Sequence, residues 1–266
     1  MVAKQTIHPG YNILLTGGAG FLGTSIIREL LSKDSLLPVK QLRVLDLKPV
    51  IGVSDPRISF IQGDVRNSAL LATSCIGIDL VIHSAAIVDW GTKSREEIMS
   101  VNYHASLNVI EAARTNRVKA MVFTSSLDVL FDGKPLRNVD ENTPYPESHS
   151  TSYCESKYLA EVAVSEANGG SLLTCIIRPS DIYGEGDPYH IGSLIQMAKG
   201  GFYVRLGNGH SKCQHVYVGN VAHAHIGAAA ALLNGQPGVD GQAYFITDGP
   251  GTVSYTHLTL PTTPYV

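Results

Sequence analysis

Near the N-terminus an apolar segment leads into a glycine-rich loop and then into a segment with helical spacing. Residues 11–16 are typical of a buried parallel strand, and apolar residues recur with helical spacing from 21 to 31. The loop fits two spacings, Gly17-x-x-Gly20-x-x-Gly23 and Gly18-x-Gly20-x-x-Gly23. Glycines let a backbone approach a pyrophosphate, and a helix N-terminus offers N–H groups to an anion. A strand, a glycine turn and a helix in this order predict a dinucleotide site.

A second apolar segment, residues 42–46, ends in the carboxylate of Asp46. An acid at this distance can hydrogen-bond both ribose hydroxyls of a dinucleotide and repels a 2′-phosphate. We therefore expect NAD rather than NADP, although the nearby Lys48 weakens this preference. The alternative is that Asp46 is a simple turn residue.

Farther along the chain, Tyr153 and Lys157 are four residues apart, which places them on one face of a helix. A cation close to a phenol favours the phenolate. Lys157 would then make Tyr153 able to accept a proton from a substrate hydroxyl or to return one to a carbonyl. Alone, the pair also fits a surface helix with an extended lysine. The glycine loop upstream is what favours the catalytic interpretation.

The chain between these motifs alternates between apolar strands and amphipathic segments. Further strands are expected at 58–61, 79–83, 120–124, 172–178 and 243–247, and long helices at 95–116 and 152–167. This pattern predicts an α/β fold with a doubly wound parallel sheet of about seven strands, whose ligands bind beyond the carboxyl ends of the strands. We expect residues 11–181 to form the dinucleotide-binding domain and 182–251 a small substrate lobe, from which 243–247 returns to the sheet.

Composition narrows the class of protein. The 266 residues are 44% apolar and 16% charged, which suits a well-buried core, and the net charge of −3 gives no reason to expect nucleic acid. Four cysteines without paired or metal-type spacing indicate free thiols in a reducing cytoplasm. Neither a signal peptide nor an apolar run of about 20 residues is present in the sequence. His223 and His225 are two apart, so we expect them to face different ways and to bind no metal.

These motifs, in this order, resemble the extended short-chain dehydrogenases/reductases, and most closely the 3β-hydroxysteroid dehydrogenase/isomerase branch. The resemblance covers residues 11 to about 251. The superfamily motifs are residues 16–23, Gly63-Asp64-Val65, 81–86, Val101-Asn102, 123–126, the Tyr153/Lys157 pair and 178–184. The motifs most specific to the branch are residues 86–91, 215–223 and 241–247.

The resemblance implies roles for individual residues. Ser126, Tyr153 and Lys157 would be the catalytic group, with Ser126 holding the substrate oxygen; Ser125 competes, because sequence cannot separate adjacent serines at a strand end. The implied cofactor-binding residues are Gly17, Gly18, Gly20, Phe21, Leu22, Gly23, Asp46, Asp64, Val65, Ala85, Asn102, Thr124, Tyr153, Lys157 and Pro179. The implied reaction is hydride transfer between NAD and a secondary alcohol of a hydrophobic, sterol-like substrate, for which the protein supplies positioning.

Several alternatives stay open at this point. The same scaffold fits a nucleotide-sugar epimerase or dehydratase, and a non-catalytic NAD-binding regulator is a third class. The intact Ser126/Tyr153/Lys157 set argues against the regulator. Whether a double bond is also isomerised is undecided. The resemblance further implies a homodimer formed through the helices near 95–116 and 152–167.

The last segment departs from the family pattern. Residues 253–262 resemble one translated reading frame of a transposase sequencing adaptor. We therefore expect native sequence to end near Gly251 and residues 252–266 to be non-native, which leaves the substrate lobe truncated. A genuine Thr/Pro-rich tail is the alternative.

Overall fold

The computed structural model describes residues 10–89, 91–189, 195–197, 199–201, 212–249 and 252–253. Its centre is a seven-stranded sheet in the order β10-β6-β5-β4-β1-β2-β3, and every neighbouring pair is parallel. The strands are β1 (Tyr11–Thr16), β2 (Val39–Asp46), β3 (Ile58–Gln62), β4 (Leu80–His83), β5 (Ala120–Thr124), β6 (Leu173–Pro179) and β10 (Ala243–Ile246). The predicted doubly wound α/β fold is therefore confirmed, including the return of the late strand to the sheet beside β6.

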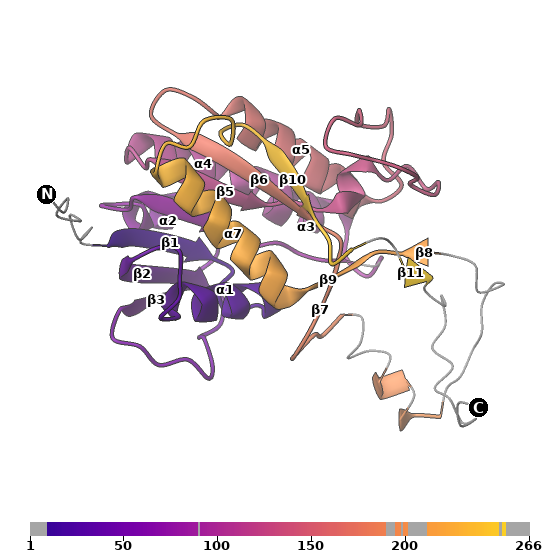
Figure 1. The fold of residues 1–266 in the computed structure, drawn as a ribbon, viewed down its shortest axis with the longest axis horizontal. Helices are drawn as coiled ribbons and strands as arrows, with labels where there is room; N and C mark the ends of the chain where they lie inside the picture. The colour runs from indigo at the N-terminus through magenta and orange to yellow at the C-terminus, as the bar shows by residue number, and fades with distance from the viewer. Residues whose placement is uncertain are drawn as a thin grey trace, which may run out of the picture.

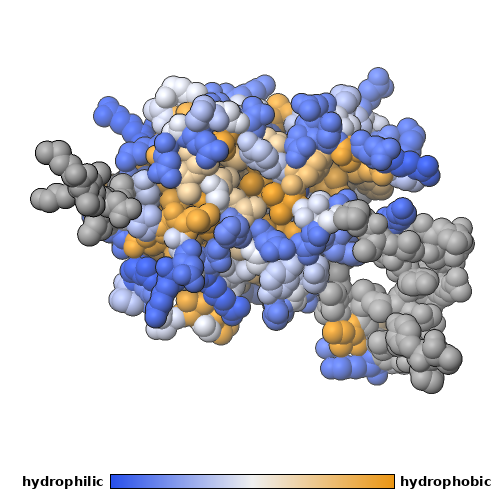
Figure 2. All heavy atoms as spheres, in the orientation of Figure 1, coloured by the Kyte–Doolittle hydropathy of each residue, from blue (hydrophilic) through white to orange (hydrophobic). Residues whose placement is uncertain are grey.

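Helices cover both faces of this sheet (Figure 1). On one face lie α1 (Phe21–Leu31) and α7 (Val218–Leu233), and on the other α2 (Ser68–Ser74), α4 (Ala105–Thr115) and α5 (Ser152–Glu166). Successive side chains of β1 point to opposite faces, as a strand requires. Ile13 therefore packs with α1 and α7, whereas Leu14 packs with α2, α4 and α5. Apolar side chains reach the surface along the middle of the α7 face, with hydrophilic ones around them (Figure 2).

The predicted helix over 95–116 is present as three joined pieces. They are α3 (Arg95–Met99), the π-helical turn η1 (Ser100–His104) and α4. Ser94 begins the segment, because its hydroxyl accepts a hydrogen bond from the Glu97 N–H at 3.1 Å. A π turn adds one residue to a helical turn and is frequent at functional sites. In this protein the π turn contains the buried side chain of Asn102.

Two small strand pairs lie beside the main sheet. β7 (Asp181–Tyr183) pairs in parallel with β9 (His215–Tyr217), and β8 (Lys212–Cys213) pairs antiparallel with β11 (Thr252–Val253). The expected non-native tail lies outside the described residues except for 252 and 253, and its origin stays a prediction that the codons of the parent locus would test. The domain boundary expected at residue 181 likewise stays a prediction. Within the described ranges, none of the helices has the length and apolar character needed to cross a bilayer.

Candidate active site

A cavity of about 900 Å³ opens at the carboxyl ends of the parallel strands, where the topology predicts a ligand. Its walls come from the β1–α1 loop, the ends of β2, β3, β4, β5 and β6, and the first turns of α3 and α5. The predicted residues on its wall are Gly17, Gly20, Phe21, Leu22, Gly23, Asp46, Asp64, Val65, Ala85, Thr124, Ser126, Tyr153, Lys157 and Pro179. These predicted residues come from seven separate segments and meet in one place.

The glycine loop lines this cavity and follows one of the two possible spacings. Gly17 has φ +76°, and a Cβ there would lie 2.7 Å from the Ala85 Cα, so only glycine fits. A Cβ on Gly23 would clash with the Gly17 carbonyl oxygen. Gly18 is different: it packs against the Val44 side chain and is absent from the cavity wall. The structure thus brings Gly17, Gly20 and Gly23 to the cavity, which favours the Gly17-x-x-Gly20-x-x-Gly23 spacing, and the predicted cofactor contact of Gly18 stays a prediction.

Asp46 joins the end of β2 to the glycine loop. One carboxylate oxygen accepts a hydrogen bond from the Ala19 N–H at 2.9 Å, and the other from the Lys48 N–H at 3.1 Å. Each carboxylate oxygen has a second lone pair that can still accept from a ligand hydroxyl. Asp46 thus borders the cavity in the place where the sequence predicts ribose recognition, and it also holds the loop in shape.

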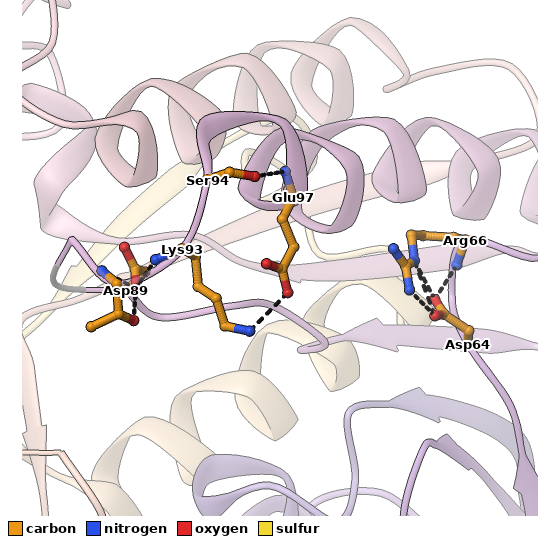
Figure 3. Close-up of polar contacts among 7 residues, drawn as sticks. Asp64, Arg66, Asp89, Lys93, Ser94 and Glu97 are labelled. Atoms are coloured by element: carbon orange, nitrogen blue, oxygen red, sulfur yellow. Dashed lines mark hydrogen bonds and ion pairs between the residues drawn. The ribbon is translucent and has the colours of Figure 1, made fainter.

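Asp64 and three charged side chains that the motifs did not single out form one rim of the cavity. Asp64 pairs with Arg66 at 2.5 Å, and Lys93 pairs with Glu97 at 2.9 Å. The hydrogen bond from Arg66 lowers the pKa of the Asp64 carboxyl, and Asp64 with a smaller contribution from Glu97 raises the pKa of Arg66. Figure 3 shows Glu97 between the two cations. Exposed ion pairs carry no sequence signature, so only the structure could place them here.

The loop before α3 is held by Asp89. Its carboxylate accepts hydrogen bonds from the N–H groups of Gly91 at 2.7 Å, Thr92 at 3.0 Å and Lys93 at 3.1 Å. Figure 3 shows Asp89 beside Lys93. The Thr92 hydroxyl also donates to this carboxylate. This bond has the largest effect on the pKa of Asp89, and together with the backbone bonds it lowers that pKa. The branch-specific motif at 86–91 therefore fixes the conformation of this loop on the cavity wall.

The structure separates the two adjacent serines. Both serines border the cavity, but the Ser125 hydroxyl donates to the buried carboxylate of Glu161. The Ser126 hydroxyl donates to Asp128 at 3.0 Å, and of the two serines it is Ser126 that acts on the pKa of Tyr153, in the lowering direction. Successive residues of an extended segment point in opposite directions, which is why only one serine can reach Tyr153. The geometry favours Ser126 over Ser125.

Lys157 and Tyr153 share the first turns of α5, as predicted, but the pKa of Tyr153 is raised rather than lowered. Lys157 is 2% exposed, and its ammonium donates to the Thr124 carbonyl oxygen and lies 4.6 Å from the Phe123 ring centroid. Burial lowers the pKa of Lys157 to about 8, against an opposing effect of Glu161. Burial and then the charge of Asp128 raise the pKa of Tyr153 well above its ordinary value. The phenol therefore keeps its proton in this structure.

Asn102 lies behind the cavity wall, and its predicted place in the cofactor groove stays a prediction. It is 1% exposed and absent from the lining. Its amide accepts from the Ile87 N–H at 2.7 Å and donates to the Ile87 carbonyl at 3.0 Å and to the Ser156 hydroxyl at 3.0 Å. The side chain thus ties the segment after β4 to the helix that carries Tyr153 and Lys157.

Thr124 borders the cavity while its hydroxyl is bonded to a histidine. The distance from Thr124 Oγ1 to His225 Nε2 is 2.7 Å, and His225 Nδ1 lies 2.7 Å from the Val221 carbonyl oxygen. Burial lowers the pKa of His225 to about 4, so the ring is neutral and Nδ1 carries the donated hydrogen. His223 instead pairs with Glu29 at 2.9 Å on the exposed side of α7. The two histidines face different ways, as the spacing predicted.

A buried polar network, which the sequence reasoning missed, supports the site from behind. Arg178 of β6 donates to Glu161 of α5 at 2.5 Å, and the Tyr145 hydroxyl donates to the same carboxylate at 2.6 Å. Both charged side chains are nearly inaccessible, at 3% and 0% exposure. Arg178 belongs to the family motif at 178–184, and Glu161 lies one helical turn after Lys157. Only these two positions in the sequence pointed to the network. The network fixes α5 on the sheet and engages the Ser125 hydroxyl.

A doubly wound sheet with a glycine loop and a Ser-Tyr-Lys group at its strand ends defines an extended short-chain dehydrogenase/reductase. More specifically, the chain belongs to the 3-beta hydroxysteroid dehydrogenase/isomerase family, whose sequence profile matches residues 14–263. This match runs past residue 251, into the segment predicted to be non-native.

Similar proteins cover most of this chain but extend beyond it. Over 267 residues the chain is 38% identical to human 3 beta-hydroxysteroid dehydrogenase type 7, covering 93% of this chain and 71% of the relative. It is 35% identical over 254 residues to the Arabidopsis thaliana 3beta-hydroxysteroid-dehydrogenase/decarboxylase isoform 1, covering 88% of this chain but only 57% of that relative. Among solved structures, dTDP-glucose 4,6-dehydratase from Streptomyces venezuelae with NAD and TYD bound superposes with a TM-score of 0.79 at 23% identity, covering 91% of this chain and 77% of that one. At such low identity this last likeness concerns the fold alone.

Proposed function

We propose that this chain is an NAD-dependent oxidoreductase that oxidises a secondary alcohol of a hydrophobic, sterol-like substrate. The observation that carries the proposal is that the glycine loop and the Ser126/Tyr153/Lys157 group line one and the same cavity. A bound nucleotide and the proton-transfer group would therefore meet without a rearrangement of the sheet. The family to which the chain belongs supports the reaction class.

The residues present fit a dinucleotide. Gly17, Gly20 and Gly23 form a strip without side chains on the cavity wall. Gly20 is the N-cap of α1 and offers no side-chain cap to the helix N-terminus. Uncapped N–H groups and the helix dipole favour a pyrophosphate there. The Asp46 carboxylate at the same edge favours ribose hydroxyls over a 2′-phosphate. When bound, NAD would supply the hydride acceptor.

The chain's own residues would orient the alcohol and move its proton. Ser126 Oγ would hold the substrate oxygen, and Tyr153 would accept the hydroxyl proton once its own proton has left. Lys157 is held by the Thr124 carbonyl beneath them and adds a positive charge to the site. Because this structure favours the protonated phenol, oxidation by this group would increase with pH up to the pKa of Tyr153 in the working complex.

Two observations support an apolar substrate over a nucleotide sugar. Leu127, Phe131 and Ile182 border the cavity near the catalytic group. A sugar nucleotide needs cations for its diphosphate, but two of the described lining cations, Arg66 and Lys93, are already paired with acids. The names of the similar proteins, 3β-hydroxysteroid dehydrogenases, agree with the apolar choice.

The test is an absorbance assay of NADH formation with a panel of 3β-hydroxysterols and a panel of nucleotide sugars. Because the chain spans 57% of the plant relative, the assay should use this chain and the complete parent protein. We expect sterol-dependent NAD reduction by the parent. Turnover of nucleotide sugars without turnover of any sterol would contradict the substrate class, and no turnover of either with intact NAD binding would favour a regulator.

Tyr153→Phe tests the assigned proton acceptor. The substitution removes only the phenol oxygen, so we expect turnover to fall by at least about 100-fold, the lower end for general acid–base catalysis, while NAD binding persists. Intrinsic fluorescence quenching by NAD measures the binding. Unchanged turnover would exclude Tyr153 from the reaction.

We also propose a homodimer and a reducing compartment. The segments α3–η1–α4 and α5 lie side by side on one face of the sheet, as the predicted dimer contact needs. Sedimentation velocity at several protein concentrations tests the dimer, and a monomer throughout would refute it.

The four cysteines, Cys75, Cys154, Cys175 and Cys213, are all free thiols, which supports a cytoplasmic location.

A further inference from the structure

We propose that His83 is a positioning residue, which couples the glycine loop to the helix that carries Tyr153 through hydrogen bonds of fixed direction. This inference rests on the proposed function for the role of Tyr153. His83 is fully buried at the end of β4 and is absent from the cavity wall. It belongs to a chain of buried polar side chains behind that wall, which are Thr16, His83, Ser106, Asn102 and Ser156.

The hydrogen bonds of Ser106 determine which nitrogen of His83 carries the hydrogen. Ser106 Oγ donates its one hydrogen to the backbone carbonyl oxygen of Asn102 at 2.7 Å, and a carbonyl can only accept. The Ser106 oxygen must therefore accept from His83 Nε2, which lies 2.9 Å away. Burial and then the charge of Lys157 lower the pKa of His83 to about 3, so the neutral ring has a single hydrogen and holds it on Nε2.

The other ring nitrogen connects His83 to the glycine loop. With the hydrogen on Nε2, Nδ1 is an acceptor, and the Thr16 hydroxyl 2.7 Å away donates to it. Thr16 Oγ1 in turn accepts from the Ala85 N–H at 3.4 Å. Thr16 directly precedes Gly17, and Ala85 is the residue whose backbone would meet a Cβ on Gly17. His83 therefore holds together the two strand ends that make the closest contact of the loop.

At its opposite end the chain reaches the backbone of Tyr153. The Ile87 N–H can only donate, so it fixes the amide oxygen of Asn102 and leaves the Asn102 NH₂ group to donate to the Ser156 hydroxyl at 3.0 Å. The Ser156 hydroxyl then donates to the Tyr153 carbonyl oxygen at 2.8 Å. Because a satisfied network in a low-dielectric interior acts as a unit, a break at one bond should be felt by the others.

The tautomer of His83 is measured by NMR of protein labelled with ¹⁵N in its histidine rings, which distinguishes a protonated ring nitrogen from an unprotonated one. His83→Asn identifies the His83 resonances among the 10 histidines. If that variant does not fold, Thr16→Ser identifies them instead, because it alters the group bonded to Nδ1. We expect a hydrogen on Nε2 and none on Nδ1. A hydrogen on Nδ1 would overturn the proposal, since the chain would then run in another direction.

Ser106→Ala tests the coupling, because Ser106 does not border the cavity and can act on a bound nucleotide only through other residues. The substitution leaves His83 Nε2 without its acceptor. We expect the dissociation constant of NAD, measured by isothermal titration calorimetry, to rise about two- to tenfold, the equivalent of one net hydrogen bond. Thr16→Val removes the hydrogen donated to Nδ1 and should have a similar effect, whereas Thr16→Ser keeps the hydroxyl and should bind NAD as the wild type does.

The matched control is Ser74→Ala. Ser74 is as buried as Ser106, at 1% exposure, but its hydroxyl has no hydrogen-bond partner among the described residues, so NAD binding should not change. If Ser106→Ala does not fold, Thr16→Val is compared with Thr174→Val, since the buried Thr174 hydroxyl donates to a different strand-to-helix contact, the Val164 carbonyl. NAD binding equal to that of the matched control would overturn the proposal. These measurements need no substrate, so the predicted tautomer and weaker NAD binding in a protein that oxidises no alcohol would uphold the coupling and refute the proposed function.

Discussion

The buried ion pair between Glu161 and Arg178 gives the sharpest prediction for stability. Glu161→Gln keeps the shape of the side chain but removes its charge. It leaves the guanidinium of Arg178 at 3% exposure with no counter-charge, where one of its nitrogens already lacks a hydrogen-bond partner among the described groups. Breaking a buried pair from one side costs about 3–5 kcal/mol. The Ser125 and Tyr145 hydroxyls would also lose a charged acceptor.

A decrease of this size in the free energy of unfolding is readily measured. At roughly 2–4 °C per kcal/mol for a chain of this size, the melting temperature should fall by about 6–20 °C. Differential scanning calorimetry and urea denaturation measure it. Glu155→Gln on the same helix is the control, because Glu155 pairs with the exposed Arg95, and we expect no measurable change there.

A double variant distinguishes the cost of an uncompensated charge from the cost of changing either side chain. Glu161→Met combined with Arg178→Met replaces both charges by apolar groups of similar length, and the uncompensated charge disappears. The double variant should therefore be more stable than Glu161→Met alone. If Glu161→Gln melts within about 2 °C of Glu155→Gln, which corresponds to at most about 1 kcal/mol, the burial argument is refuted.

Two further predictions concern the loop and the buried histidines. Gly23→Ala places a Cβ against the Gly17 carbonyl and should weaken NAD binding at least about tenfold by fluorescence titration, whereas Gly227→Ala, whose Cβ meets open space, should not. Burial lowers the pKa of His83 to about 3 and of His225 to about 4, so both are neutral when folded. Unfolding protonates them below about pH 6.5, so stability should fall as the pH drops from 6.5 toward 4, by up to about 1.4 kcal/mol per unit for each. An unchanged urea midpoint between pH 7 and pH 5 would contradict this.

The sequence predicted the sheet and the position of the cavity because both follow from local patterns. Apolar strands, the glycine loop and Asp46 lie next to one another in the chain, and their spacing determines their geometry. The choice between Ser125 and Ser126 depended instead on Glu161, which α5 brings beside Ser125 from 36 residues away. No local pattern contains such a contact.

Two other differences have equally physical causes. The π turn around Asn102 changes the helical register by one residue, so a regular helix could not predict that its amide would face Ile87 and Ser156. The state of Tyr153 depended on burial and on Asp128, whereas sequence reasoning considered Lys157 alone. Spacing along a helix indicates which groups are neighbours, but the charge they carry depends on everything else around them.

The place of β10 has a consequence during synthesis of the protein. It covers the outer edge of β6, a strand buried along nearly its whole length, and is separated from β6 by more than sixty residues of chain. Until residue 246 has emerged from the ribosome, the backbone of β6 presents an unpaired apolar edge, which is the kind of surface that recruits other chains. The nascent protein therefore passes through a stage in which its catalytic residues are already made but its sheet is still open to aggregation.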